Sequence, residues 1–144
     1  MTNAQHLIAA CSAMVVLVFI VGLRMLQVRM SEMKEKRIHP QATATSLQMA
    51  AKLQSVQPAD NFRNLFETPV LFYALMAIAI GAGHTPGWLV AGAWAYVLLR
   101  VVHSIIHCTY NTVMHRFAAF GISFLLVVVL WLSFLSSFLS KAAG

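Results

Sequence analysis

"FRNLFETPVLFYALMAIAIGA", residues 62–82, decides the fold class, because a charged motif leads directly into an apolar run. A helix needs about 20 mostly apolar residues to cross the hydrocarbon core of a bilayer, and this stretch has that length. Charged side chains at membrane depth are costly unless they face a partner or a wet cavity. The stretch therefore predicts a membrane-spanning helix that begins with a polar site formed by Arg63, Asn64 and Glu67.

Three further apolar runs have the same character, at roughly 6–28, 87–108 and 117–139, and the last contains no charged residue. The runs are continuous and lack the alternation with period 2 that is typical of a membrane β-barrel. We therefore expect an all-α membrane protein, a four-transmembrane-helix bundle in which residues 1–144 form a single domain. Residues 30–60 form its one long loop.

The composition is also that of a membrane protein, since 60% of the residues are hydrophobic and 10% are charged. In a soluble domain about a quarter of the residues are charged. The net charge of +6 does not indicate nucleic acid binding. The basic residues lie beside apolar runs, and the sequence contains no motif of a nucleic-acid-binding fold. Cys11 and Cys108 lie inside apolar runs, so no disulfide framework or redox motif is predicted.

The distribution of Lys and Arg predicts how the chain is oriented in the membrane. Basic residues concentrate in the long loop, which holds Lys34, Lys36, Arg37 and Lys52, and Arg116 lies in the break before the last run. The opposite break, at 81–87, has neither Lys nor Arg. Since positive residues stay on the cytoplasmic side, we expect both basic connections in the cytoplasm and both termini in the periplasm. The short termini suggest a bacterial inner-membrane protein.

Two polar stripes are predicted at the same depth on two spans. At 100° per residue of helix, four side chains before and within the second span share an arc of about 100°, namely Asp60, Arg63, Asn64 and Glu67. In the third span and just after it, a similar arc holds Arg100, His103, His107, Tyr110 and Asn111. The simplest interpretation is that the two stripes face one shared polar site.

Two other interpretations remain open at this point. Arg63 and Glu67, four residues apart, are spaced for a structural ion pair, and Asn64 for a hydrogen bond between helices. His103 and His107, also four residues apart, are spaced for two metal ligands on one helix face, with Glu67 as a third. The metal pattern is weak because no HExxH motif and no cysteine accompanies it.

No catalytic motif of a hydrolase or nucleotide-binding enzyme is present, because the chain has neither a nucleophile elbow nor a glycine-rich phosphate loop. Arginines near one membrane face are the more informative feature, and they are Arg29, Arg63, Arg100 and Arg116. Guanidinium groups bind carboxylates through two parallel hydrogen bonds. The set therefore indicates a small anionic ligand that carries carboxylates.

Three short motifs carry a resemblance to a known family. They are "QVR" at 27–29, "RNLFE" at 63–67 and "RVVHSIIHCTYNTVMHR" at 100–116. With the layout of four spans and a long basic loop after the first, the chain resembles the MAPEG superfamily, the membrane-associated proteins of eicosanoid and glutathione metabolism. The resemblance covers nearly the whole chain.

The resemblance implies a homotrimer with active sites between neighbouring subunits and glutathione as co-substrate, without a metal. Glutathione would enter from the cytoplasmic side, and its lipophilic partner through the bilayer. The glutathione-binding residues would be Arg29, Arg63, Asn64, Glu67, Arg100 and His103, with His107 and Tyr110 on the same stripe. The catalytic residue would be Arg116, because a guanidinium favours thiolate over thiol and the thiolate is the nucleophile.

Several positions depart from the family pattern. Asp60 stands where the prostaglandin and leukotriene enzymes have an arginine, and His107 where they have a tyrosine. Phe117 and Phe120 stand where the prostaglandin enzyme has a serine and a later tyrosine. These differences argue against specific eicosanoid synthesis.

We therefore expect a membrane-bound glutathione-dependent transferase or peroxidase that acts on lipophilic electrophiles or lipid hydroperoxides. The alternative is a non-catalytic lipid-binding or scaffold member of the same family, which Asp60 favours because it reverses a charge beside an anionic ligand. A small transporter or metal-binding bundle is the third possibility.

Overall fold

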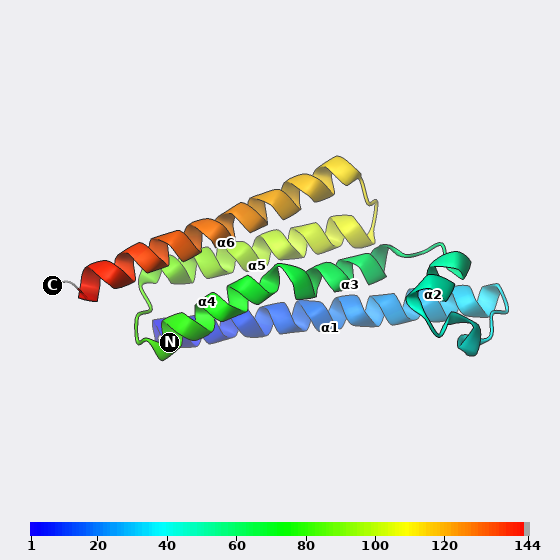
Figure 1. Cartoon of the computed structure of the whole chain (residues 1–144), viewed down its shortest axis with the longest axis horizontal. Coiled ribbons are helices and arrows are strands. Elements are labelled where there is room, and N and C mark those ends of the chain that lie inside the picture. Colours follow the sequence, from blue (N-terminus) through cyan, green and yellow to red (C-terminus); the bar gives the residue numbers. More distant parts are fainter. Residues whose placement is uncertain (143–144) are drawn as a thin grey trace.

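The structure is a computed structural model that describes residues 1–142, with side chains up to residue 141. Long helices run side by side along the molecule (Figure 1), and no described residue lies in a strand. They are α1 (Asn3–Glu35), α3 (Gln57–Glu67), α4 (Pro69–Gly81), α5 (Gly87–Cys108) and α6 (Val113–Ala142). The 3₁₀-helix η1 (Pro40–Thr43) and the short helix α2 (Ser46–Lys52) lie in the long loop.

Four segments are long and apolar enough to cross a membrane, and they are Asn3–Glu35, Gln57–Gly81, Gly87–Cys108 and Val113–Lys141. Their outward faces are apolar, with Phe19 at 64% exposed, Leu98 at 65% and Leu125 at 64%. Such faces suit a hydrocarbon environment, because exposed apolar surface of this extent is rare in soluble monomers. The prediction of an all-α integral membrane protein with a four-helix bundle is confirmed.

The second span is two helices rather than the single helix expected from its apolar run. The break falls between Glu67 and Pro69. Proline has no backbone N–H and cannot donate to the carbonyl four residues earlier, which here is that of Leu65. The chain tightens instead, with the amide of Leu71 donating to the carbonyl of Thr68 at 3.1 Å. The polar part of the span, α3, is thereby separated from the apolar part, α4.

The core of the bundle follows from apolar residues three and four positions apart on each helix. On α1 these are Leu7, Ala10, Met14, Leu17 and Val21, all buried. A small residue allows α5 and α6 to approach closely, because a Cβ at Gly92 would collide with the side chain of Leu130. Small residues at helix contacts are characteristic of membrane bundles, where close van der Waals packing drives association.

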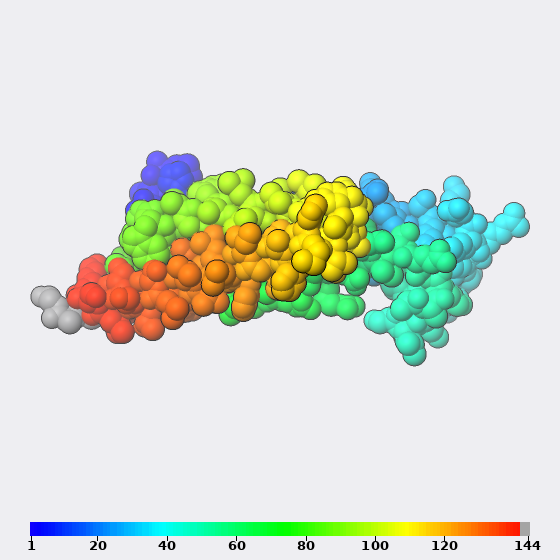
Figure 2. Space-filling model, turned by 90° about the horizontal axis from the view of Figure 1, so that it is seen from above, coloured from blue at the N-terminus to red at the C-terminus, as the bar shows by residue number. Residues whose placement is uncertain are grey.

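The start of α1 and the end of α6 lie at one end of the bundle, and the basic connections lie at the other (Figure 1). The end of α1 and the long loop project beyond the α5–α6 turn, as the cyan and yellow regions of Figure 2 show. This layout agrees with the predicted placement of both termini on one side of the membrane. The side itself stays a prediction.

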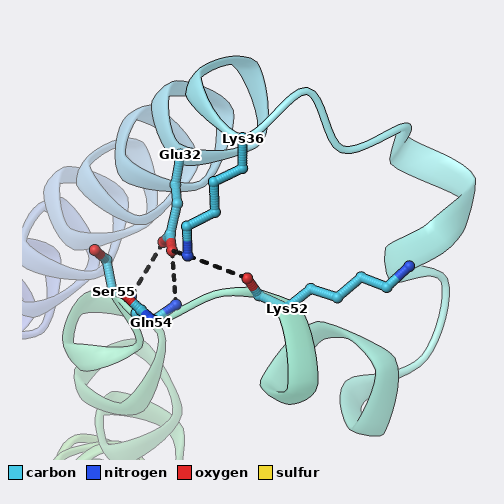
Figure 3. A network of polar contacts seen from close by, with 5 residues as sticks. All are labelled: Glu32, Lys36, Lys52, Gln54 and Ser55. Atoms are coloured by element: carbon cyan, nitrogen blue, oxygen red, sulfur yellow. Dashed lines mark hydrogen bonds and ion pairs between the residues drawn. The ribbon is translucent and has the colours of Figure 1, made fainter.

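A carboxylate fastens the long loop to the end of α1 (Figure 3). Glu32 accepts hydrogen bonds from the backbone amides of Gln54 at 2.7 Å and Ser55 at 3.1 Å. It also forms an ion pair with Lys36 at 2.6 Å, and the Lys36 ammonium reaches the carbonyl of Lys52 at 3.3 Å. We call Glu32, Lys36, Gln54 and Ser55 the Glu32 clasp. Because it holds the residues just before α3, it fixes where the second span begins.

Candidate functional site

Polar side chains gather inside the bundle at the end that carries the α5–α6 turn. Three of them lie along one face of α5, and they are almost fully buried: Arg100 is 0% exposed, His103 1% and His107 2%. Spacings of three and four residues place these side chains one above the other on the helix. Arg116, from the first turn of α6, joins them. The structure thus brings together four of the residues that the sequence predicted for the site, and we call them the Arg–His cluster.

Arg100 is a buried cation without a carboxylate partner. Its guanidinium donates from Nη2 to the carbonyl of Asn64 at 3.0 Å and from Nη1 to the hydroxyl of Ser123 at 3.4 Å. Its Cζ lies 5.7 Å from the centre of the Phe120 ring, and its Nε has no hydrogen-bond partner. Among the described residues the one ion pair is Glu32–Lys36. Since a buried charge is costly unless it is paired, this position favours an anionic ligand.

Arg116 is held in place by two acceptors. Its Nη1 lies 3.1 Å from Nε2 of His107 and donates to Oδ1 of Asn111 at 2.9 Å. Asn111 has a φ of 48°, a left-handed conformation that asparagine adopts more readily than most residues. No described residue accepts a hydrogen bond from Nη2 or Nε of Arg116. Two of its three nitrogens are therefore available to a ligand.

His103 is oriented by the backbone of α6. Its Nδ1 lies 3.3 Å from the carbonyl oxygen of Arg116, whereas its buried Nε2 has no partner. The buried Nδ1 of His107 also has no partner. The His103 and His107 rings are 5.4 Å apart and nearly perpendicular. Unpaired buried polar atoms are uncommon in proteins and often mark functional sites.

A groove of about 240 Å³ opens beside the cluster. It is lined by Asn64, His103, Val113, Arg116, Phe117 and Phe120. Three of the lining side chains are polar or cationic (Asn64, His103 and Arg116), and three are apolar (Val113, Phe117 and Phe120). Such a groove can receive a ligand that has an anionic or polar end and an apolar reaction partner.

Of the other predicted site residues, Asn64 contacts Arg100 through its backbone carbonyl and lines the groove, whereas the remaining four do not join the cluster within one subunit. Arg63 and Glu67 are exposed on α3, and Arg29 is half-buried on α1. The alternative of an Arg63–Glu67 ion pair is wrong, since the two residues form none. Tyr110 is 58% exposed and turns toward His115, with its hydroxyl 3.4 Å from the histidine Nδ1. α5 ends at Cys108, so Tyr110 does not continue the helical stripe.

Three buried polar residues inside the bundle, Asn61, Ser104 and Ser123, were not predicted from the sequence. Asn61 is fully buried, donates to the Cys108 sulfur at 3.3 Å and accepts from the Ser104 hydroxyl at 3.3 Å. Ser123 on α6 supports Arg100. The signal for Asn61 was its spacing, because the buried side chains of α3 are Pro58, Asn61 and Leu65. It lies on the inward apolar face rather than in the charged stripe.

The metal alternative gains no support from the geometry. Among the residues that the structure describes, no three His, Cys, Asp or Glu side chains lie together as a metal would require. One nitrogen of His103 and one of His107 face groups of Arg116. A cationic guanidinium beside these rings is a poor setting for a metal cation.

Fold and site define an integral membrane protein with an arginine- and histidine-lined polar site inside a helical bundle. Among models of protein families, that of the MAPEG family matches residues 7–136, and the chain belongs to this family. The resemblance inferred from the motifs is confirmed. Membership supports a membrane glutathione transferase or a related function in general, and the family also includes non-catalytic members. No curated protein and no solved structure matches the chain.

Proposed function

We propose that the protein is a membrane-bound glutathione-dependent transferase or peroxidase that acts on lipophilic electrophiles or lipid hydroperoxides. The observation that carries this proposal is the position of Arg116, which lines a groove with both polar and apolar side chains and has two nitrogens without a hydrogen-bond partner among the described residues. Family membership supports glutathione as the thiol.

Arg100 supports an anionic ligand. The buried guanidinium has no carboxylate partner and keeps an unpaired Nε, and the peptide glutathione brings two carboxylates. An arginine binds a carboxylate with charge-assisted hydrogen bonds that are roughly twice as strong as neutral ones. Arg29, Arg63, Asn64 and Glu67 complete the proposed glutathione site, with His103, His107 and Tyr110.

Arg116 is proposed as the catalytic residue that stabilises the thiolate. His107 and Asn111 hold its Nη1, so the guanidinium is positioned before the ligand arrives. In the transferase reaction, the thiolate sulfur forms a bond to the electrophilic carbon while the leaving group departs with its electron pair. A positioned cation beside the sulfur lowers the barrier by stabilising the nucleophile in its ionised form.

The distribution of charge supports a homotrimer with sites between subunits. Arg63 and Glu67 lie exposed on the surface of a single subunit, at the polar end of a membrane span. Charged side chains that face lipid are costly, and a neighbouring subunit would cover them. In this arrangement glutathione enters from the cytoplasm, the apolar substrate enters from the bilayer, and both termini are periplasmic in a bacterial inner membrane.

Asp60 favours the second candidate, a non-catalytic lipid-binding or scaffold protein. It is exposed in the first turn of α3 and places a negative charge near the proposed site of an anion. Turnover of glutathione with a model electrophile by the detergent-solubilised protein separates the two. We expect conjugate formation above the uncatalysed rate. Binding of lipid without turnover of any thiol would support the scaffold.

A further inference from the structure

We propose that Nε2 of His103 accepts the proton of the thiol when the thiolate forms, so that the proton stays in the site during the reaction. This inference rests on the proposed function, because it requires a thiol in the groove beside Arg116. It assigns to His103 a role in proton transfer beyond contact with the ligand.

The hydrogen-bond partner of His103 determines which nitrogen carries its hydrogen. Nδ1 lies 3.3 Å from the carbonyl oxygen of Arg116, and a carbonyl oxygen can only accept. Nδ1 is therefore the N–H donor. In a neutral imidazole the other nitrogen is then an acceptor with a free lone pair, and this nitrogen is Nε2.

The lone pair of Nε2 has no partner within the described subunit. The atom is buried, the residue is 1% exposed, and it forms no hydrogen bond. A buried acceptor that is left unpaired costs about 1–3 kcal/mol. His103 also lines the groove together with Arg116. A donor that reaches Nε2 from this groove would satisfy the acceptor, and a thiol S–H is such a donor.

No other group of the cluster offers a comparable base. His107 faces the Arg116 guanidinium with Nε2 at 3.1 Å, and since the guanidinium only donates, that lone pair is already used. Arg100 and Arg116 are donors without acceptor capacity. The remaining polar residue of the groove is Asn64, whose amide is not basic at neutral pH.

The charges around His103 come from three elements. Arg100 and His107 lie on its own helix and Arg116 on α6. Helix α3 carries Asp60, Arg63 and Glu67, all exposed and outside the groove lining. An imidazolium formed alone between two guanidinium groups would be repelled. An imidazolium formed together with a thiolate adds no net charge to the cluster, because one proton moves between two neighbouring groups.

Every bond and proton is accounted for, both when the thiolate forms and when the product forms. The S–H bond breaks, its electron pair stays on sulfur, and an N–H bond forms at Nε2. After the sulfur has attacked the electrophile, the departing alkoxide or other anion takes the proton from Nε2, and the imidazole returns to its neutral form. His103 therefore acts first as general base and then as general acid, with no additional reactant.

Proton counting on the purified full-length protein tests this assignment. Glutathione is added in weak buffer with a pH indicator, and the ultraviolet thiolate band is recorded at the same time. S-methylglutathione, which has no thiol proton, corrects for protons released by binding alone. If His103 holds the proton, the wild type forms the band and releases close to no proton per thiolate.

His103→Asn is the informative variant. Its amide N–H can take the place of Nδ1 and donate to the Arg116 carbonyl, but it has nothing at the position of Nε2. We expect either loss of the band or release of about one proton per thiolate, with turnover lower by about 10²-fold or more. His39→Asn is the matched control, because His39 is exposed in the long loop and lies outside the groove, and it should behave as the wild type.

Release of one full proton per thiolate by the wild type would overturn the inference and leave the proposed function intact. That measurement decides the matter even if His103→Asn does not assemble. The absence of a thiolate band in the wild type, together with no turnover, would instead contradict the proposed function itself.

Discussion

Nη1 of Arg116 and Nε2 of His107 lie 3.1 Å apart, and this contact joins the start of α6 to the last turn of α5. His107 stands where the eicosanoid enzymes of the family have a tyrosine. Here the histidine accepts a hydrogen bond from the arginine proposed to stabilise the thiolate. The departure from the family pattern is therefore compatible with an ordered Arg116.

Arg116→Ala should abolish the thiolate band and most turnover while much of the affinity for glutathione remains. A free alkyl thiol has a pKa of about 8.5, and a guanidinium beside it lowers that by about one or two units, roughly 1.4–2.7 kcal/mol. Absorbance titration and calorimetry in detergent measure the two effects separately. Arg63→Ala is the contrast and should weaken binding first. Normal turnover by Arg116→Ala would mean that another residue activates the thiol, and Arg29 would be the next candidate.

Glu67→Ala should lower the yield or the stability of the assembled protein as well as its turnover. In one subunit the carboxylate is exposed and forms no ion pair. In the proposed trimer a neighbouring subunit would cover it beside an arginine, and removing one partner of a buried pair typically costs about 3–5 kcal/mol. Native mass spectrometry should detect three chains in the wild type and fewer intact trimers in the variant. Glu35→Gln, an exposed carboxylate at the end of α1, is the control. An effect on turnover alone would contradict the assembly role.

The cysteine of a Thr45→Cys variant should react with a membrane-impermeant thiol reagent only from the cytoplasmic side. The cysteine of a Thr85→Cys variant should react only from the periplasmic side. Thr45 lies in the basic loop, and Thr85 lies in the turn between α4 and α5, at the opposite end of the bundle (Figure 1). The unsubstituted protein is the control, because it shows how much of the reagent reacts with the half-buried Cys11 and Cys108. The reverse pattern would place the Arg–His cluster at the periplasmic face.

Glu32→Gln should release the long loop at neutral pH. Glu32 accepts hydrogen bonds from the backbone amides of Gln54 and Ser55 and forms an ion pair with Lys36. Glutamine keeps the size of the side chain but removes its negative charge, and hydrogen bonds to a charged acceptor are roughly twice as strong as those to a neutral one. We expect trypsin to cleave after Arg37 and Lys52 several-fold faster in the variant. Glu35→Gln should be cleaved at the wild-type rate.

The helices could be predicted from the sequence because long apolar runs in a bilayer must satisfy their own backbone hydrogen bonds. The Arg–His cluster could be predicted in part, since Arg100, His103 and His107 share one face of α5. The prediction that Tyr110 shares this face is wrong, because it extends the helix beyond Cys108, where α5 ends. A helical projection applies only while the helix continues, and the chain turns after Cys108.

The second span illustrates a different limit of prediction from sequence periodicity. Periodicity identifies which residues share a face, but it does not say whether that face meets the same subunit or a neighbour. Arg63 and Glu67 therefore appeared equivalent to Arg100, although they lie exposed while Arg100 is buried. The buried amide of Asn61 was overlooked because it lies among apolar neighbours rather than in the charged stripe.

The left-handed backbone of Asn111 limits which amino acids can replace it without loss of function. Glycine adopts this conformation easily but has no side chain to accept the hydrogen bond from Arg116. Valine, isoleucine and threonine are disfavoured at positive φ by their branched Cβ. Asparagine and aspartate combine the conformation with an acceptor oxygen. In a selection for activity from a library randomised at this single codon, these two residues should dominate the survivors.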